Sequence, residues 1–250
     1  MTTAEADEKP EYLKPHGGQT ELTLLFPPFR ASGARGGPSP SEAHDPVRAR
    51  RTVETLLTVD AVLEQLPDRR KQDLRSPEVR ADLDLVAVGC WGNGVQIFDP
   101  AWGDNGLTGA LLNEVGEQRR LNPQARIVGW VDMDYGLHFT RHVVNVPEGA
   151  ALSVEGWDSG EGWTVRGDPE EVLRAAGIDP ASVRERYIRL EDADDPDDPG
   201  DRYLHDWDAY AGLFHEGFDD LGDPDLKVSV FRVRRTRRAE SDIREAWWGS

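Results

Sequence analysis

Two carboxylates and two imidazoles lie close together in the middle of the chain, as Asp132, Asp134, His138 and His142. Carboxylate oxygens and neutral imidazole nitrogens suit Mn²⁺, Fe²⁺ or Zn²⁺, and such an ion activates water or positions a phosphate. Residues two apart on a strand share a face, so the two carboxylates would point the same way. If residues 135–137 form a turn, the four side chains meet across a hairpin. This interpretation predicts a metal-dependent enzyme whose cofactor is one divalent transition metal.

The same residues also have an interpretation without a metal. The alternation of Val131, Asp132, Met133 and Asp134 is typical of an antiparallel sheet with one face in solvent. The aspartates are then ordinary solvent-facing residues, and no cofactor is predicted. The two interpretations differ in whether residues 134–138 turn back or continue a single strand.

A second candidate site is the segment 91–106, in which glycines lie beside tryptophans. Glycine lets a ligand approach the backbone closely, and tryptophan offers an apolar platform. Trp91, Asn93 and Trp102 are therefore candidate ligand-binding residues. Equally, Gly92-Asn93-Gly94 supplies the positive φ angles of a tight hairpin turn. The third glycine of a phosphate-binding loop is missing.

Cys90 is the only cysteine in the chain, at the end of an apolar run. A nucleophilic cysteine needs a nearby base and a lowered pKa, and the sequence places no histidine beside it. We expect a small buried side chain instead. The sequence also carries no nucleophile elbow, P-loop, dinucleotide fingerprint, zinc-binding cysteine set or kinase signature.

The chain is strongly acidic, with a formal net charge of −18 over 250 residues. Such a charge repels nucleic acid and anionic lipid, so neither nucleic-acid nor membrane binding is predicted. It favours a basic protein partner, or it serves only to keep the protein soluble. The basic segment 232–238 is expected to attract the acidic segment 191–201 within the same chain.

The sequence predicts a cytoplasmic protein, because it begins without a signal peptide and has no apolar run that could span a bilayer. One cysteine permits no intrachain disulfide. All but four of the 29 basic residues are arginine, which suggests a GC-rich genome. The oligomeric state has no signature in the sequence.

Apolar patterning and turn residues divide the chain into short elements. Strands are expected at 20–26, 85–91, 94–98, 125–133, 139–146, 151–157, 162–166 and 226–233. Helices are expected from Asp45-Pro46, at 60–66, at 107–121, from Asp168-Pro169, from Asp179-Pro180 and at 203–218, with the Asp-Pro pairs acting as caps.

The strands cluster without alternating helices, which favours an α+β fold over a parallel βαβ fold. We predict a single domain over 20–238, with an antiparallel or mixed central sheet flanked by helices. A loose acidic tail is expected at 1–19, a disordered acidic loop at 191–201, and a C-terminal tail at 239–250. Trp247 and Trp248 in that tail would dock onto the body or onto a partner.

Three segments, 59–67, 82–100 and 125–134, resemble an uncharacterised family of actinobacterial proteins, which implies an origin and a single domain but no activity. The hairpin ending in Asp99-Pro100 is similar to bacterial toxin-immunity proteins, which are often acidic. The leading hypothesis is therefore a non-catalytic acidic cytosolic binding protein, of the immunity or inhibitor kind. The competing hypothesis is the metal-dependent enzyme built on Asp132, Asp134, His138 and His142.

Overall fold

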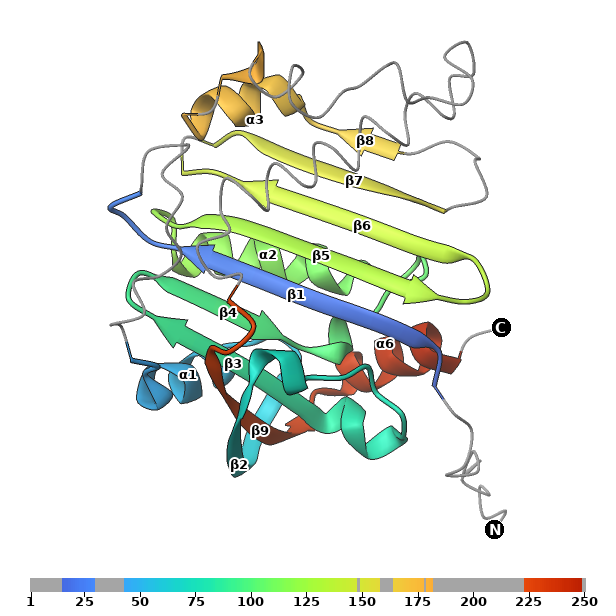
Figure 1. Cartoon of the computed structure of the whole chain (residues 1–250). Coiled ribbons are helices and arrows are strands. Elements are labelled where there is room, and N and C mark those ends of the chain that lie inside the picture. The colour runs from blue at the N-terminus through green and yellow to red at the C-terminus, as the bar shows by residue number, and fades with distance from the viewer. Residues whose placement is uncertain are drawn as a thin grey trace.

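The computed structural model describes residues 15–29, 43–147, 149–157, 164–177, 179–181 and 223–248. Within them one nine-stranded sheet runs in the order β2-β9-β3-β4-β1-β5-β6-β7-β8 (Figure 1). Every paired neighbour is antiparallel. The predicted α+β class with an antiparallel sheet is thus observed, and most of the fold is sheet.

The strands are β1 (Gly17–Leu25), β2 (Val59–Arg70), β3 (Leu85–Trp91), β4 (Gly94–Phe98), β5 (Arg126–Asp134), β6 (His138–Asn145), β7 (Ala151–Trp157), β8 (Thr164–Arg166) and β9 (Lys227–Arg235). The helices are α1 (Pro46–Val53), α2 (Ala110–Leu121), α3 (Pro169–Ala175) and α6 (Arg237–Trp248). Three 3₁₀ turns connect them: η1 (Lys71–Asp73), η2 (Arg80–Asp84) and η3 (Pro100–Trp102).

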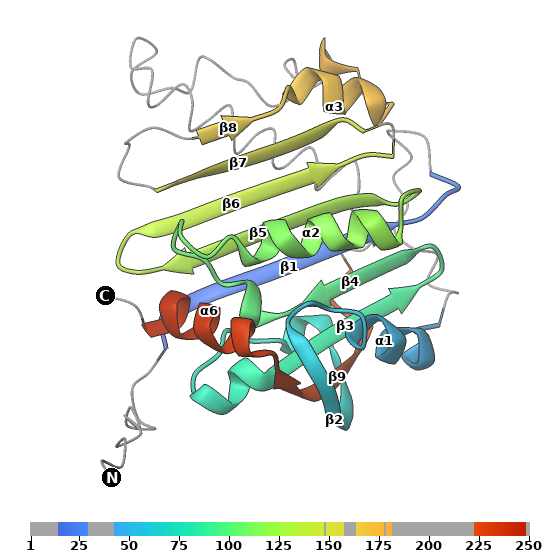
Figure 2. The same ribbon diagram turned by 180° about the vertical axis from the view of Figure 1, so that it is seen from behind.

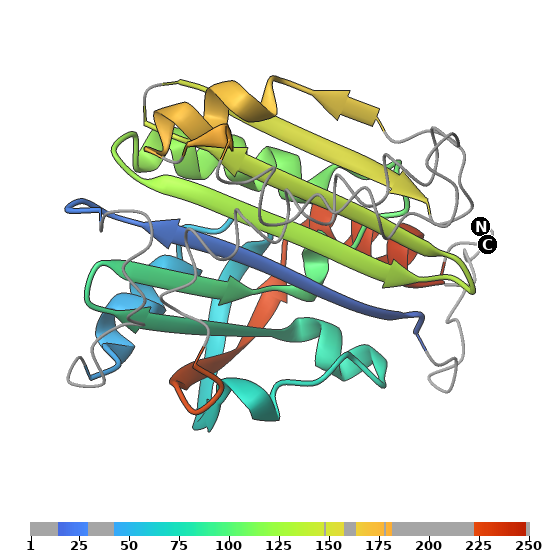
Figure 3. The same ribbon diagram turned by 45° about the horizontal axis from the view of Figure 1, so that its top comes forward.

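Helices α1, α2 and α6 cover one face of the sheet, as Figure 2 shows from behind. The main core lies between this face and the helices, and includes Ile127 and Val131 of β5, Leu111 of α2 and Trp247 of α6. Alternate residues of β5 point to the other face, where Val128 packs with Val172 and Leu173 of α3. We call the face covered by α1, α2 and α6 the helical face, and the opposite face the open face. Figure 3 shows the sheet obliquely, with these three helices behind it.

Asp45-Pro46 and Asp168-Pro169 begin helices as predicted, whereas most of the helix expected from Asp179-Pro180 lies beyond residue 181, outside the described residues. The Asp45 carboxylate accepts hydrogen bonds from the backbone N–H groups of Val47 and Arg48, both at 3.0 Å. Asp168 caps α3 in the same way, through Glu170 N at 2.8 Å. Each carboxylate satisfies donors that a helix leaves unpaired at its start.

Residues 60–66 were predicted as a helix, and the structure makes them part of strand β2. Val62, Leu63 and Leu66 have helical spacing, but β2 pairs along its length with β9, which is remote in sequence. The ladder is irregular, with three register shifts, so the apolar residues do not alternate as in a regular strand. Tertiary pairing therefore overrides the local pattern.

The C-terminal tail predicted at 239–250 is helix α6 as far as Trp248. The Trp247 side chain is buried, and its Nε1 donates to the Pro100 carbonyl at 2.8 Å. Gly103 makes room for it, since a Cβ there would lie 2.6 Å from Trp247 Nε1. Trp247 thus docks onto the body of its own chain, one of the two outcomes foreseen.

Three other predictions lie outside the described residues: most of the N-terminal tail at 1–19, the acidic loop at 191–201 and the helix at 203–218. The attraction expected between the basic segment 232–238 and the acidic segment 191–201 also involves residues outside the described ranges. Within those ranges, two arginines of β9 have acidic partners on β2. Arg234 pairs with Asp60 at 2.5 Å and Arg232 with Glu64 at 3.4 Å, both across the β2–β9 ladder.

Candidate functional site

The β5–β6 hairpin forms through residues 135–137, and all four candidate metal ligands lie on its open face. Asp134 is opposite His138, but its carboxylate accepts from Gly136 N at 2.8 Å and so serves the turn. His138 Nδ1 instead lies 2.9 Å from Asp132 Oδ1. The hairpin therefore brings two of the four candidates into contact.

His142 lies further along β6, opposite Trp130. It is four positions along the strand from His138, which is about 14 Å at ~3.4 Å per residue. Among the described residues, no group of three or more histidine, cysteine, aspartate or glutamate side chains is placed to hold a metal ion. The geometry matches the interpretation as a solvent-facing sheet surface.

The candidate ligand platform is also dispersed. Trp91 is buried on the open face in a small cluster with Val228 and Val230, whereas Trp102 is buried in the main core under the helices. Asn93 sits in the β3–β4 turn, where its Nδ2 donates to the carbonyls of Phe26 and Pro28 at 2.7 and 3.1 Å. The three residues form no common surface, and Asn93 has a structural role.

Cys90 is buried as expected, and desolvation by burial raises the pKa of its thiol to about 11. The thiol therefore stays protonated and unreactive near neutral pH. The backbone N–H of Cys90 donates to His44 Nδ1 at 3.1 Å.

His44 links Cys90 to two further side chains. Its Nε2 lies 2.8 Å from Ser229 Oγ, and that hydroxyl donates to Asp68 Oδ1 at 3.0 Å. Because Nδ1 accepts a backbone N–H, the proton of neutral His44 is on Nε2 and points at Ser229. In this tautomer His44 donates to Ser229 and cannot accept its proton. His44 is therefore not a base for Ser229, although the two residues are arranged like a Ser-His dyad.

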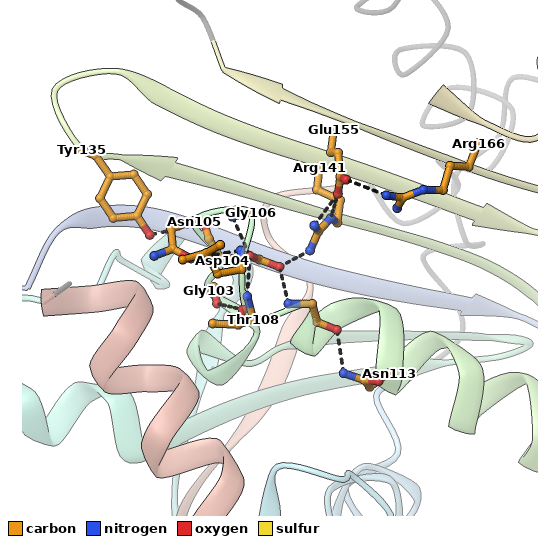
Figure 4. A network of polar contacts seen from close by, with 12 residues as sticks. Gly103, Asp104, Asn105, Gly106, Thr108, Asn113, Tyr135, Arg141, Glu155 and Arg166 are labelled. Atoms are coloured by element: carbon orange, nitrogen blue, oxygen red, sulfur yellow. Dashed lines mark hydrogen bonds and ion pairs between the residues drawn. The ribbon is translucent and has the colours of Figure 1, made fainter. Parts of the chain in front are cut away.

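A buried ionic network crosses the helical face of β6, β7 and β8 (Figure 4). Arg141 bonds both the Asp104 and the Glu155 carboxylates, and Arg166 reaches Glu155 at 3.4 Å. The side chains of Arg141 and Asp104 are 3% and 0% exposed. Asp104 also accepts from Gly106 N at 2.8 Å and Gly109 N at 2.9 Å. The network fixes the loop before α2 to the sheet and leaves Asp104 fully engaged.

A second cluster of buried polar side chains connects the start of β2 with α2, η3 and the end of β9. Arg235 pairs with Asp99 at 2.8 Å, and Thr58 Oγ1 donates to Asp99 at 2.5 Å. Nearby, the Glu114 carboxylate accepts from Leu57 N at 2.9 Å and Gln118 Nε2 at 2.8 Å. Desolvation by burial raises the pKa of Glu114 to about 7.

The described structure has a pocket of about 560 Å³ between the open face and the segment after β2, large enough for a small ligand. Its floor is apolar and comes from Leu85 and Ala87 of β3, Phe98 of β4 and Val230 of β9. Segment 71–78 forms the opposite wall and is tied to β1 by Ser76, whose hydroxyl bonds both the N–H and the carbonyl of Gly18.

Polar groups stand around this floor. The walls include Gln19 and Glu21 of β1, Trp130 of β5, Arg69 of β2 and Lys71 of η1. Arg75, Asp73 and Glu78 add exposed charges of both signs along segment 71–78. An apolar floor with a few polar side chains at its margin is the usual composition of a binding site.

Sequence reasoning missed this pocket because its lining comes from six strands and the segment 71–78, and no single stretch of sequence carries the pattern. One signal was available: two of the chain's four lysines, Lys71 and Lys227, lie with Arg69 and Arg70 at one end of the β2–β9 ladder. That concentration is unusual in so acidic a chain.

Residues 5–250 match the model of a family of unknown function, DUF6333. The chain belongs to this family. The match supports the resemblance to an uncharacterised family, and the actinobacterial origin stays a prediction. No curated protein and no solved structure matches the chain.

Membership of DUF6333 identifies no ligand and no catalytic residue. Among the described helices, none is both long and apolar enough to cross a membrane.

Proposed function

We propose that this DUF6333 protein is a non-catalytic binding protein of the cytosol, and that its ligand occupies the pocket on the open face. The observation that carries the proposal is the pocket itself, with its apolar floor and polar margin. Residues on the open face of β1, β3, β4, β5 and β9 line the pocket, so paired strands of the sheet hold the site in place.

The state of the reactive side chains supports a non-catalytic role. The Cys90 thiol has a raised pKa, and Asp104 is held by Arg141 and backbone donors. The metal-dependent alternative has weaker support, because Asp132 and His138 pair with each other while His142 lies apart on β6.

The net charge of −18 supports a second form of the same function, in which the partner is a basic protein. Such a complex would weaken steeply with added salt, because attraction between exposed charges is screened within a Debye length of about 8 Å at physiological ionic strength. The single buried cysteine is compatible with the reducing cytosol.

Native mass spectrometry of protein purified without chelators or a metal column tests the pocket. We expect an added mass of a small organic ligand in the wild type. Gln19→Trp should fill the pocket from its exposed position on β1 and abolish that mass. Thr140→Trp is the matched control, since Thr140 shares the open face but does not line the pocket.

The outcomes separate clearly. A ligand that persists in Gln19→Trp lies elsewhere, and the pocket then has no part in the function. A bare wild-type mass, together with no binding in a screen of small molecules, would overturn the pocket proposal. In that case a salt-sensitive complex with a basic protein would be the form of the function that remains.

A further inference from the structure

Two leucines point into solvent at one corner of the sheet, outside the pocket. Leu107 lies in the loop between η3 and α2 and is 77% exposed, and Leu137 lies in the β5–β6 turn and is 51% exposed. A single exposed leucine is ordinary on a protein surface, whereas two on neighbouring loops form an apolar patch of the kind that binds partners.

The two loops are in contact. A Cβ on Gly106 would lie 3.4 Å from the ring of Phe139, two residues after Leu137. The Tyr135 hydroxyl donates to the Ala246 carbonyl at 2.6 Å and lies 3.3 Å from the Asp104 carbonyl oxygen. Figure 4 shows Tyr135 pointing from the hairpin towards this loop. Both leucines therefore belong to one surface.

Hydrogen bonds fix the backbone on which each leucine is presented. The buried Asp104 carboxylate accepts from three backbone N–H groups of its loop, and Asn105 Oδ1 accepts from Leu107 N at 3.2 Å. In the hairpin, Tyr135 N donates to the Leu137 carbonyl at 3.1 Å. A side chain on a fixed backbone loses little further freedom on binding, so this rigidity favours association.

Each leucine has a carboxylate beside it. Asn105, which binds Leu107 N, also donates through Nδ2 to Glu245 Oε1 of α6 at 3.4 Å. Asp134 accepts from Gly136 N at 2.8 Å, within the turn that carries Leu137. Both carboxylates are exposed, and neither forms an ion pair with a described residue. We call Leu107, Leu137, Asp134 and Glu245 the corner surface.

Charge decides which class of partner fits the corner surface. A second copy of the chain would bring the same two carboxylates and its own net charge of −18, so self-association here is opposed by repulsion. Nucleic acid is repelled for the same reason. A basic protein whose apolar side chains lie next to lysines or arginines complements both features.

We infer that the corner surface docks a basic protein, with apolar side chains of the partner on Leu107 and Leu137 and its cations at Glu245 and Asp134. This inference rests on the second form of the proposed function, for which it names the docking surface.

Fluorescence anisotropy with a defined peptide tests the inference. The probe is fluorescein-labelled Lys-Leu-Lys-Ala-Ala-Lys-Leu-Lys with an amidated C-terminus, and its partner probe has serine in place of both leucines. We expect the leucine peptide to bind roughly fivefold or more tightly than the serine peptide, because burial of a leucine side chain is favourable. Binding should weaken as salt is raised from about 50 to about 300 mM.

Variants locate the bound peptide. Leu107→Ser and Leu137→Ser should each weaken binding roughly fivefold. Asp134→Asn and Glu245→Gln keep their acceptor oxygens and lose the charge, so they should make the salt dependence shallower. The matched controls should leave binding unchanged: Leu63→Ser, a leucine 57% exposed on β2, and Glu171→Gln, an exposed carboxylate on α3. Equal thermal midpoints establish that every variant is folded.

Equal affinity for the two peptides, or unchanged affinity in both leucine variants, would overturn the inference. Loss of peptide binding in Gln19→Trp would place the peptide in the pocket and overturn it too. A wild type that binds no peptide but carries a copurified ligand lost in Gln19→Trp would overturn the inference and leave the pocket proposal standing. Absence of both peptide binding and any pocket ligand would overturn the two together.

Discussion

Replacing Glu114 by glutamine should make the protein more stable at alkaline pH. Glu114 is fully buried on α2, and burial raises its pKa from 4.5 to about 7. The folded state therefore binds a proton more tightly than the unfolded state does. By linkage, the stabilising effect is complete below pH 4.5 and is lost as the pH rises through about 7.

The size of the loss follows from the shift. The difference between 4.5 and about 7 corresponds to roughly 3 kcal/mol of unfolding free energy between pH 4 and pH 9, at ~1.36 kcal/mol per unit of pKa. Glutamine has the same shape and no charge, and it still accepts from Leu57 N. The glutamine amide nitrogen would then face Gln118 Nε2, so Gln118 has to turn its carbonyl towards it and give up the hydrogen bond that this carbonyl accepts from Asn122 Nδ2 at 3.0 Å. We therefore expect Glu114→Gln to gain roughly 1–3 kcal/mol relative to wild type at pH 9.

Urea unfolding of both proteins at intervals from pH 4 to pH 9 measures this difference. The gap between wild type and Glu114→Gln should open between about pH 5 and pH 8. Glu117→Gln is the control on the same helix, because Glu117 is more exposed and its pKa is lowered by its hydrogen bond to Arg120. A constant gap between the Glu114→Gln and wild-type curves at every pH would refute the argument from burial.

Three further predictions concern buried groups. Burial lowers the pKa of His44 below 6.5, so its stabilising effect should be present above pH 6.5 and be lost at lower pH; urea unfolding should show this loss in wild type and not in His44→Gln. Trp247→Phe removes the hydrogen bond to the Pro100 carbonyl and should cost about 1–3 kcal/mol at pH 7, and a cost below about 0.5 kcal/mol would contradict its docking role. Arg141→Met leaves the Asp104 carboxylate buried without its cation and should cost about 3–5 kcal/mol, whereas Arg166→Met, at a side chain 62% exposed, should change the denaturant midpoint little.

Local chemistry in the sequence predicted local structure well. The Asp45-Pro46 cap begins α1, and the glycines around Asn93 form the β3–β4 turn, because these effects depend on neighbours in sequence. The β5–β6 hairpin also follows from its alternation.

Features that depend on remote pairing were not visible in the sequence. Residues 60–66 have helical spacing, and only the presence of β9 makes them a strand. Trp247 follows a polar segment, and only the space beside Gly103 makes it a core residue. The pocket needs the same information, since its lining comes from strands that are far apart in the sequence.

The place of β9 in the sheet has a consequence for synthesis. β9 pairs with β2 on one side and β3 on the other, yet it is made last of all the strands. A nascent chain that has not reached residue 227 has β3 as an open edge with apolar residues on both faces, and β2 has no strand to pair with. Open apolar edges invite association between chains, so stalled or truncated products are the form of this protein most in need of chaperones.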